Sequence, residues 1–198
     1  MSSDPDKAVQ SDDSEPAARP DSLFTRIVSW VLIGLFVVII ANEARRWLSS
    51  PQSSPQGGRA APDFSVPRID AAASPGERFE LSAQRGHPVL IDFWATWCGP
   101  CKESLPLIDQ VHQRLHPRGL RTIAIEIEGA EAKAKQFASA LQLKMPLGSD
   151  PGTVSERYGI TQIPLTVLID AEGQVRRIFR GVHSADELTR AIEAVGLR

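Results

Sequence analysis

The chain of 198 residues has little of what a metal site or a polyanion-binding protein needs. It contains two cysteines and four histidines, and its formal net charge at pH 7 is -2. A tetrahedral zinc site takes about four ligands, but the histidines are scattered, and only His112 and His116 share helical i, i+4 spacing. A net charge this small gives no bulk attraction to nucleic acid. The sequence therefore argues against a zinc site and against a nucleic acid partner.

Both cysteines lie in one short segment, FWATWCGPCKE, as Cys98 and Cys101. A disulfide between them closes a loop too small to stabilise the fold much through chain entropy, so a structural staple is not expected. The segment reads as a strand, a turn and a helix, and Pro100 suits the first turn of that helix because its missing N–H is not needed there. This pattern predicts a redox-active dithiol.

The predicted turn makes the two cysteines unequal. Cys98 falls at the helix N-terminus, where free backbone N–H groups and the helix dipole favour a thiolate, and Lys102 adds a positive charge nearby. Cys101, one turn further along, is expected to be less exposed. We therefore expect Cys98 to attack a substrate disulfide and Cys101 to resolve the mixed disulfide. The direction of the net reaction depends on the reduction potential, which the motif does not fix.

The first quarter of the chain differs in composition from the rest. Residues 1–22 are rich in Ser, Asp, Pro and Ala without apolar periodicity, which predicts a disordered acidic tail. Residues 23–48 carry an uncharged run from Ile27 to Ala41. As a helix this run spans about 22 Å, and flanking apolar and Trp residues extend it towards the roughly 30 Å of a bilayer core. We expect a single-pass transmembrane anchor; a cleaved signal peptide would need a short basic start and a clear cleavage site.

A tether is expected to follow this anchor. Residues 49–60 are rich in Ser, Pro, Gln and Gly, which is typical of a flexible linker, and the folded domain is expected from 61 to 198. Lys and Arg residues are balanced on the two sides of the anchor. The positive-inside rule therefore does not decide its orientation.

Apolar periodicity divides the domain into alternating strands and helices. Two apolar runs around Glu172 and Gly173 indicate a hairpin, and a final helix is expected between a Ser184 cap, with Glu187 at the capping-box position, and Gly196. The expected strands are 79–81, 88–94, 120–128, 165–170 and 175–181, and the other expected helices are 100–115, 130–141 and 153–158. This order predicts an α/β domain with a mixed central sheet flanked by helices.

The segment FWATWCGPCK resembles the active site of the thioredoxin superfamily. The opening APDF (61–64), followed by LSAQRGHPVLIDFWATWCGPC, is similar to the membrane-tethered TlpA/ResA-like branch, and the resemblance covers about residues 60–198. It implies a thioredoxin-like fold. It also implies a thiol–disulfide oxidoreductase with no cofactor besides its own Cys98–Cys101 disulfide.

The resemblance further implies a substrate-binding surface around the dithiol. The family carries a cis-proline facing the cysteines, which this sequence supplies as Ile163-Pro164; a cis bond costs little only before proline. It would expose the backbone of Ile163 to pair with an extended substrate segment. The alternative is an ordinary trans-proline at a strand start. Trp97, expected as a lid beside the thiolate, completes this surface with Gly99 and Pro100.

Asp92 lies on the apolar strand VLIDFW, where burial would raise its pKa. It matches the buried acid that in ordinary thioredoxins helps to move the proton of the second cysteine. The resemblance therefore implies that Asp92 is a general acid/base for Cys101. The alternative is an acid at the strand end that is solvated or paired with a lysine. Two later acids, Glu126 and Glu128, are expected at a solvated strand end.

One position departs from the pattern of the branch. ResA-like proteins tend to carry an acid three residues after the second cysteine, where this sequence has Ser104; its glutamate, Glu103, comes one residue earlier. A one-residue shift turns a helical side chain by about 100°, so the role does not transfer to Glu103. We expect Glu103 to be a first-turn acid favoured by the helix dipole. The departure argues against a dedicated haem-chaperone specificity and favours a broader reductase.

The resemblance places the domain at a bacterial inner membrane, facing the periplasm or the cell exterior. A reductase of protein disulfides there needs electrons from a membrane thiol transporter of the DsbD or CcdA kind, because that compartment is kept oxidising.

Two alternative functions stay open. A peroxiredoxin-like peroxidase shares the wider fold and the APDF-like opening, although its threonine would lie three residues before a lone cysteine, whereas Thr96 lies two before Cys98. In a tethered binding or chaperone module the cysteines would be incidental.

Overall fold

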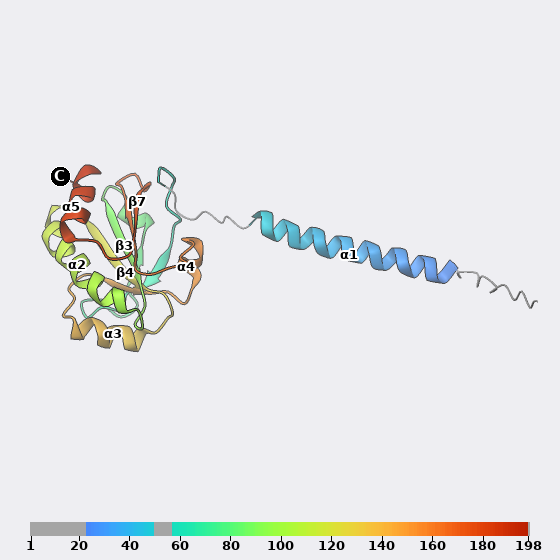
Figure 1. Ribbon diagram of the computed structural model, residues 1–198, viewed down its shortest axis with the longest axis horizontal. Helices are drawn as coiled ribbons and strands as arrows, with labels where there is room; N and C mark the ends of the chain where they lie inside the picture. Colours follow the sequence, from blue (N-terminus) through green and yellow to red (C-terminus); the bar gives the residue numbers. More distant parts are fainter. Residues whose placement is uncertain (1–22, 50–56, 198) are drawn as a thin grey trace, which may run out of the picture. The chain divides into compact units, whose positions relative to one another are not determined.

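The computed structural model describes residues 23–49 and 57–197, and the side chains of residues 27–42 and 57–197. The described residues belong to two compact units, an N-terminal helix and a domain (Figure 1). The expected acidic tail, residues 1–22, and residues 50–56 of the expected tether lie outside the described part of the chain. Each unit is considered by itself.

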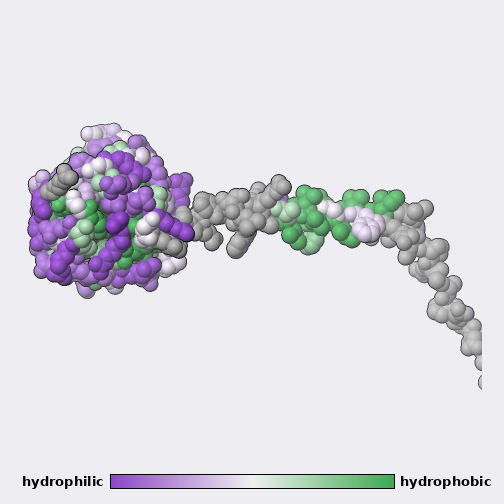
Figure 2. Space-filling view, turned by 90° about the horizontal axis from the view of Figure 1, so that it is seen from above, coloured by the Kyte–Doolittle hydropathy of each residue, from purple (hydrophilic) through white to green (hydrophobic). Residues whose placement is uncertain are grey.

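The N-terminal unit contains one helix, α1 (Leu23–Ser49). Its described side chains, residues 27–42, are exposed all around the helix and are mostly apolar, so this stretch is largely green in Figure 2. Within residues 23–49 and 57–197, no helix combines the length and the apolarity that crossing a membrane requires.

The domain is built on a five-stranded sheet with the order β5-β4-β3-β6-β7. The central strand β3 (Val89–Trp94) runs parallel to β4 (Arg121–Glu126) and antiparallel to β6 (Leu165–Ile169). The edge strands are β5 (Leu147–Ser149), parallel to β4, and β7 (Val175–Arg180), antiparallel to β6. The expected mixed central sheet is confirmed.

Three helices cover one face of the sheet. They are α2 (Gly99–Leu115), α3 (Glu131–Ala140) and α5 (Ala185–Ala194). Their apolar sides pack against Leu90 and Trp94 of β3 in one buried cluster. This is the face that matters for the site, because α2 begins directly after the turn that follows β3 (Figure 1).

The other face is covered by a short helix and a small second sheet. The helix is α4 (Thr153–Arg157), and the sheet pairs β1 (Ser65–Pro67) with β2 (Arg78–Glu80) in antiparallel register. They pack against Ile91 and Phe93. Because successive residues of a strand point to opposite faces, two covered faces leave every residue of β3 buried.

Short elements account for the differences from the expected map. β1 and β5 are three-residue strands, too short to show an alternating pattern, and they were not expected. The 3-10 helices η1 (Ser82–Gln84) and η2 (His116–Arg118) also carry no periodic signal. β4 ends at Glu126, before the expected end at residue 128, because the chain turns there. The remaining expected strands and helices are present within a few residues of their predicted bounds.

The domain begins before the expected boundary at residue 61. The backbone N–H of Gly58 donates to Val175 O (2.7 Å), and Val175 N–H donates to Arg59 O (2.8 Å). Ala60 also forms an antiparallel bridge with Gln174. Residues 58–60, which the sequence assigns to the tether, are therefore part of the domain, because they pair with the start of the edge strand β7.

Local signals at the end of the chain are confirmed. Gly173 lies in the turn of the β6–β7 hairpin with φ 78°, a conformation that favours glycine. Ser184 caps α5, and its side chain accepts a hydrogen bond from Glu187 N–H (3.2 Å). Gly196 follows that helix with φ 89°.

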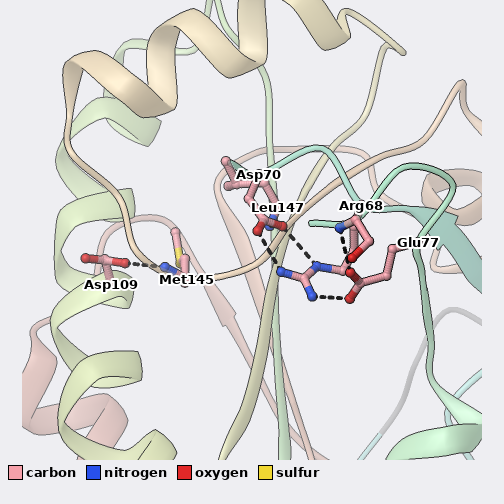
Figure 3. Close-up of polar contacts among 7 residues, drawn as sticks. Arg68, Asp70, Glu77, Asp109, Met145 and Leu147 are labelled. Atoms are coloured by element: carbon pink, nitrogen blue, oxygen red, sulfur yellow. Dashed lines mark hydrogen bonds and ion pairs between the residues drawn. The ribbon is translucent and has the colours of Figure 1, made fainter. Parts of the chain in front are cut away.

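An ion-pair network holds the loop after β1 against the edge strand β5. Arg68 lies between Asp70 and Glu77 and pairs with both (Figure 3). Asp70 also accepts a hydrogen bond from the backbone N–H of Leu147 (3.1 Å). Burial opposes ionisation of Asp70, but these donors hold its pKa below the ordinary value. The network therefore fixes the loop after β1 to the edge strand β5.

Candidate active site

The two cysteines lie where β3 passes into α2. β3 ends at Trp94, and α2 begins at Gly99. Cys98 is the N-cap residue of α2, and its Sγ accepts a hydrogen bond from the backbone N–H of Cys101 (3.2 Å). Donors at a helix N-terminus stabilise a negative charge on sulfur once the disulfide is reduced. The predicted placement of Cys98 at the start of the helix is confirmed.

Cys98 and Cys101 form a disulfide with each other. Cys101 is fully buried, whereas Cys98 keeps 4% of its surface exposed. Both belong to the apolar cluster between the sheet and its three covering helices. The difference in exposure is small and has the predicted direction, because Cys98 is the less buried of the two cysteines.

The peptide bond of Ile163-Pro164 is cis. The cis prediction is confirmed, and the trans alternative is wrong. Pro164 directly precedes β6, whose first residue, Leu165, pairs with Phe93 near the end of β3. The proline therefore lies at the same end of the sheet as the dithiol. Ile163 packs against the cluster that contains both cysteines.

Two exposed apolar side chains flank this end of the domain. Trp97 is 66% exposed, and Val182 is 39% exposed. Val182 follows Gly181, whose N–H donates to Pro164 O (2.9 Å) and so brings the loop after β7 to the cis-proline. The sequence predicts Trp97 at this site but gives no signal for Val182, because a single valine after a strand has no distinctive pattern before the loop folds back.

The other predicted surface residues are also near the dithiol. Gly99 and Pro100 are exposed in the first turn of α2, next to Cys98. Trp97, Gly99, Pro100, Ile163 and Pro164 thus all lie at the end of the sheet where β3 stops and β6 starts.

Asp92 is fully buried in the middle of β3. Its Oδ1 accepts a hydrogen bond from Thr166 Oγ1 (2.7 Å), while its Oδ2 has no hydrogen-bond partner among the described residues. Burial raises the pKa of Asp92 to about 7, and the bond from Thr166 opposes that rise. Asp92 alternates with Leu90 and Trp94, so it faces the helix layer that contains Cys101. The solvated or lysine-paired alternative is wrong.

Asp109 of α2 shows how a structural acid differs. It is also buried, but its Oδ1 accepts from the backbone N–H groups of Lys144 and Met145 (2.7 Å each), and its Oδ2 accepts from Gln113 (2.6 Å). Figure 3 shows the contact with Met145. Both oxygens are used to hold the segment before β5. Asp92 instead has one oxygen without a hydrogen-bond partner among the described residues, and a buried polar atom of this kind calls for an explanation.

Glu126 is buried, and the prediction that it lies at a solvated strand end is wrong. β4 lies inside the sheet between β3 and β5, so its last residue is covered. The carboxylate accepts from the backbone N–H groups of Ala130 (2.8 Å) and Glu128 (3.3 Å). Burial nevertheless raises its pKa. Glu128 is exposed as predicted.

The glutamate after the second cysteine is displaced outward, as the spacing predicts. Glu103 is exposed on α2, whereas Ser104 is 2% exposed and faces the core. The prediction of a first-turn acid is wrong, because α2 begins at Gly99 and its first turn contains no acidic residue. Lys102 lies over the ring of Phe137, 5.8 Å from its centroid. The role of the family acid therefore has no equivalent at Glu103.

The dithiol can carry electrons by itself. Opening the Cys98–Cys101 disulfide takes up two electrons, and closing it gives them to another disulfide. No three His, Cys, Asp or Glu side chains gather to hold a metal ion in the part of the chain that the structure describes. A domain of this topology with such a pair at the start of α2 is a thioredoxin-like thiol–disulfide oxidoreductase.

Comparison with known proteins gives the family. Residues 58–178 match the model of the AhpC/TSA family. The chain belongs to this family. Within it, the relatives described below make it a TlpA/ResA-like protein.

The chain is similar to the thiol–disulfide oxidoreductase ResA of Oceanobacillus iheyensis, with 32% identity over 132 residues, 66% of this chain and 68% of the relative. It is also 30% identical over 141 residues to the thioredoxin-like protein YneN of Bacillus subtilis, covering 70% of this chain and 79% of the relative. Among solved structures, it resembles one described as a DsbE-type thiol:disulfide interchange protein from Chlorobium tepidum. That likeness has a TM-score of 0.64 and 31% identity, and it covers 72% of this chain and 99% of the other.

Proposed function

We propose that the protein is a membrane-tethered reductase of protein disulfides that works outside the cytoplasm. The observation that carries the proposal is the unequal pair, a Cys98 at the N-cap of α2 that keeps 4% of its surface exposed and a fully buried Cys101 one turn later. The Cys98 thiolate attacks a substrate disulfide and forms a mixed disulfide, releasing one substrate thiolate. Cys101 then attacks Cys98, the bond to the substrate breaks, and the second substrate thiolate leaves. Two electrons pass from the dithiol to the substrate, and no further cofactor is needed.

We propose that Asp92 is the base for the second step. Its buried carboxyl faces the layer that contains Cys101 and has an unpaired oxygen. A group with a pKa of about 7 is half ionised near neutral pH, which suits it to accept the proton of Cys101 and later to return it. The proton of the Cys101 thiol goes to the carboxylate, and the resulting thiolate attacks Cys98.

The substrate is proposed to bind as an extended segment along Ile163 and Pro164. The exposed ring of Trp97 and the small residues Gly99 and Pro100 line the same end of the domain, and together they leave room for a backbone to approach Cys98. A structure of a trapped Cys98 adduct in which Trp97 and Pro164 stay uncovered would contradict this assignment.

The direction of the reaction is tested by the reduction potential of the Cys98–Cys101 pair. The potential can be measured for the full-length protein in detergent by equilibration with glutathione buffers. A value near the roughly -270 mV of thioredoxin supports a reductase, and a value near the roughly -120 mV of DsbA supports an oxidase instead. A reductase in an oxidising compartment would receive its electrons from a membrane thiol transporter of the DsbD or CcdA type.

The apolar surface of α1 is proposed to hold the protein in the bacterial inner membrane. Arg at the centre of a membrane helix costs about 2.5–3.5 kcal/mol. Replacing Leu32 and Phe36, both exposed on α1, with Arg should therefore move most of the protein from carbonate-washed membranes to the soluble fraction. The control replaces Ser53 and Ser54 with Arg, which adds the same charge in the tether. Equal membrane retention of the two variants would refute the anchor.

A further inference from the structure

Asp92 has a polar partner on the neighbouring strand β6. The register of β3 and β6 places Thr166 directly opposite Asp92, and the Thr166 hydroxyl donates to Asp92 Oδ1 over 2.7 Å. Thr166 is 1% exposed, and Asp92 is fully buried. Water therefore does not compete for this hydrogen bond, and the pair is fixed by the backbone register of two central strands.

The other groups around Asp92 form no hydrogen bond with it among the described residues. On β4, Ala124 lies opposite Asp92. Thr122, two residues before Ala124, opposes Leu90, and its buried hydroxyl has no hydrogen-bond partner among the described residues. Glu126, two residues after Ala124, is held by backbone N–H groups beyond the strand end. The buried residues of β7 and α5 in this layer, among them Phe179 and Leu188, are apolar. α2 contributes Cys101 as its buried titratable group at this end of the layer.

The two oxygens of Asp92 are consequently unequal. Oδ1 is occupied by Thr166, and Oδ2 is buried without a partner among the residues that the structure describes. A hydroxyl that donates to one oxygen fixes the rotation of the carboxyl group and leaves the other oxygen as the place where a proton can be taken up. A free carboxyl with no such neighbour could turn and present either oxygen.

We propose that Thr166 is a positioning residue for the resolving step, which holds Oδ1 of Asp92 so that Oδ2 receives the proton of Cys101. The inference rests on the proposed base role of Asp92. In the step, the S–H bond of Cys101 breaks and an O–H bond forms at Oδ2. The Cys101 thiolate forms the bond to Cys98 Sγ, and the substrate sulfur leaves Cys98 with its electron pair.

Thr166 also influences the pKa of Asp92 and therefore the pH midpoint of the resolving step. Its hydroxyl stabilises the ionised carboxylate more than the neutral acid, because a hydrogen bond to a charged acceptor is the stronger one. Removing it should raise the pKa of Asp92 further, since burial would then act unopposed. The carboxylate is the active base, so the pH midpoint of the resolving step should rise.

The test uses the reduced full-length protein in detergent and a chromogenic nitrothiobenzoate disulfide. Attack by Cys98 releases one coloured thiolate, and resolution by Cys101 releases the second, so stopped-flow absorbance gives the rate of each step between pH 5 and 10. For Thr166→Val, which has nearly the same shape, we expect the midpoint of the second step to rise by about one pH unit. The rate of that step at pH 7 should fall about fivefold, with the first step unchanged. Thr166→Ser keeps the hydroxyl and should restore the wild-type midpoint.

The outcomes distinguish the positioning role of Thr166 from the proposed base role of Asp92, on which it rests. If Asp92→Asn keeps the wild-type pH profile, the base role itself fails. If Asp92→Asn loses the midpoint near pH 7 but Thr166→Val keeps it, the base role stands and the positioning role is wrong. In the double variant, Thr166→Val should add nothing to Asp92→Asn. The midpoint does not depend on the fraction of active protein, and Thr166→Ala serves in the same way if the valine variant does not fold.

Discussion

Replacing Cys98 with serine is expected to lower the rate of insulin disulfide reduction by at least ~10³-fold. A serine hydroxyl at the N-cap of α2 is not ionised at neutral pH and cannot form a mixed disulfide, so the first step of the cycle is lost. The fold should remain, because Cys98 and Cys101 close a loop too small to stabilise the domain much. The measurement compares turnover at equal concentrations of folded protein, checked by circular dichroism.

Cys101→Ser is the matched control for this prediction. It should lose turnover as well, because it keeps the Cys98 nucleophile but has no second thiol to release the substrate. It should therefore accumulate substrate proteins on Cys98 as adducts that a thiol reverses, whereas Cys98→Ser should accumulate none. A tethered binding module would behave differently, and full biological activity of a variant with both cysteines replaced would overturn the enzymatic function.

Asp92→Asn is expected to remove a large pH dependence of stability. The pKa of Asp92 is about 7 in the folded domain, against 3.8 for the free side chain. Between these values the folded state binds a proton that the unfolded state has lost, so the free energy of unfolding falls as the pH rises from about 4 to about 7. The span of about three pKa units corresponds to about 4 kcal/mol. Above pH 7 the folded wild-type protein carries a buried negative charge on Asp92. The Asp92→Asn variant has no charge at this position.

The contribution of Asp92 to the pH dependence of stability is the difference between the wild type and the Asp92→Asn variant. Urea unfolding of the oxidised full-length protein at pH 5 and pH 8 gives the change for the wild type and for Asp92→Asn. Other acids affect both proteins alike: burial of Glu126 raises its pKa and acts in the same direction, while Asp70, whose pKa is lowered, stabilises the fold less as the pH falls. Glu128→Gln, at an exposed site, is the control. An equal pH dependence in wild type and Asp92→Asn would show that folding does not raise the pKa of the Asp92 carboxyl, so that it is ionised in both the folded and the unfolded state over this range.

Local sequence signals predicted the parts of the site that lie on one stretch of chain. The turn between β3 and α2 follows from Pro100 and the flanking apolar strand, and the cap of α5 follows from Ser184 and Glu187. Each depends on residues within about one helical turn of each other. For the same reason, the unequal exposure of Cys98 and Cys101 could be predicted before their surroundings were known.

The parts that sequence reasoning missed depend on contacts between distant segments. Thr166 becomes the partner of Asp92 through the register of β6 on β3, and a shift by one residue would turn it to the other face. The sequence places Glu126 at the end of a strand, but it does not show that β5 pairs with β4 on the side away from β3 and so buries this residue. Val182 reaches the cis-proline through one hydrogen bond from Gly181. None of these arrangements leaves a periodic signal in the sequence.

The pairing of residues 58–60 with the first residues of β7 determines where the domain can be held. Val175 lies beside Ile169, which pairs with Val89 at the beginning of β3, so the chain enters at the end of the sheet opposite the dithiol. The length of β3 therefore separates the point where the chain enters the domain from Cys98. A label or a support attached at residues 58–60 would be attached at the end of the sheet that does not contain the dithiol.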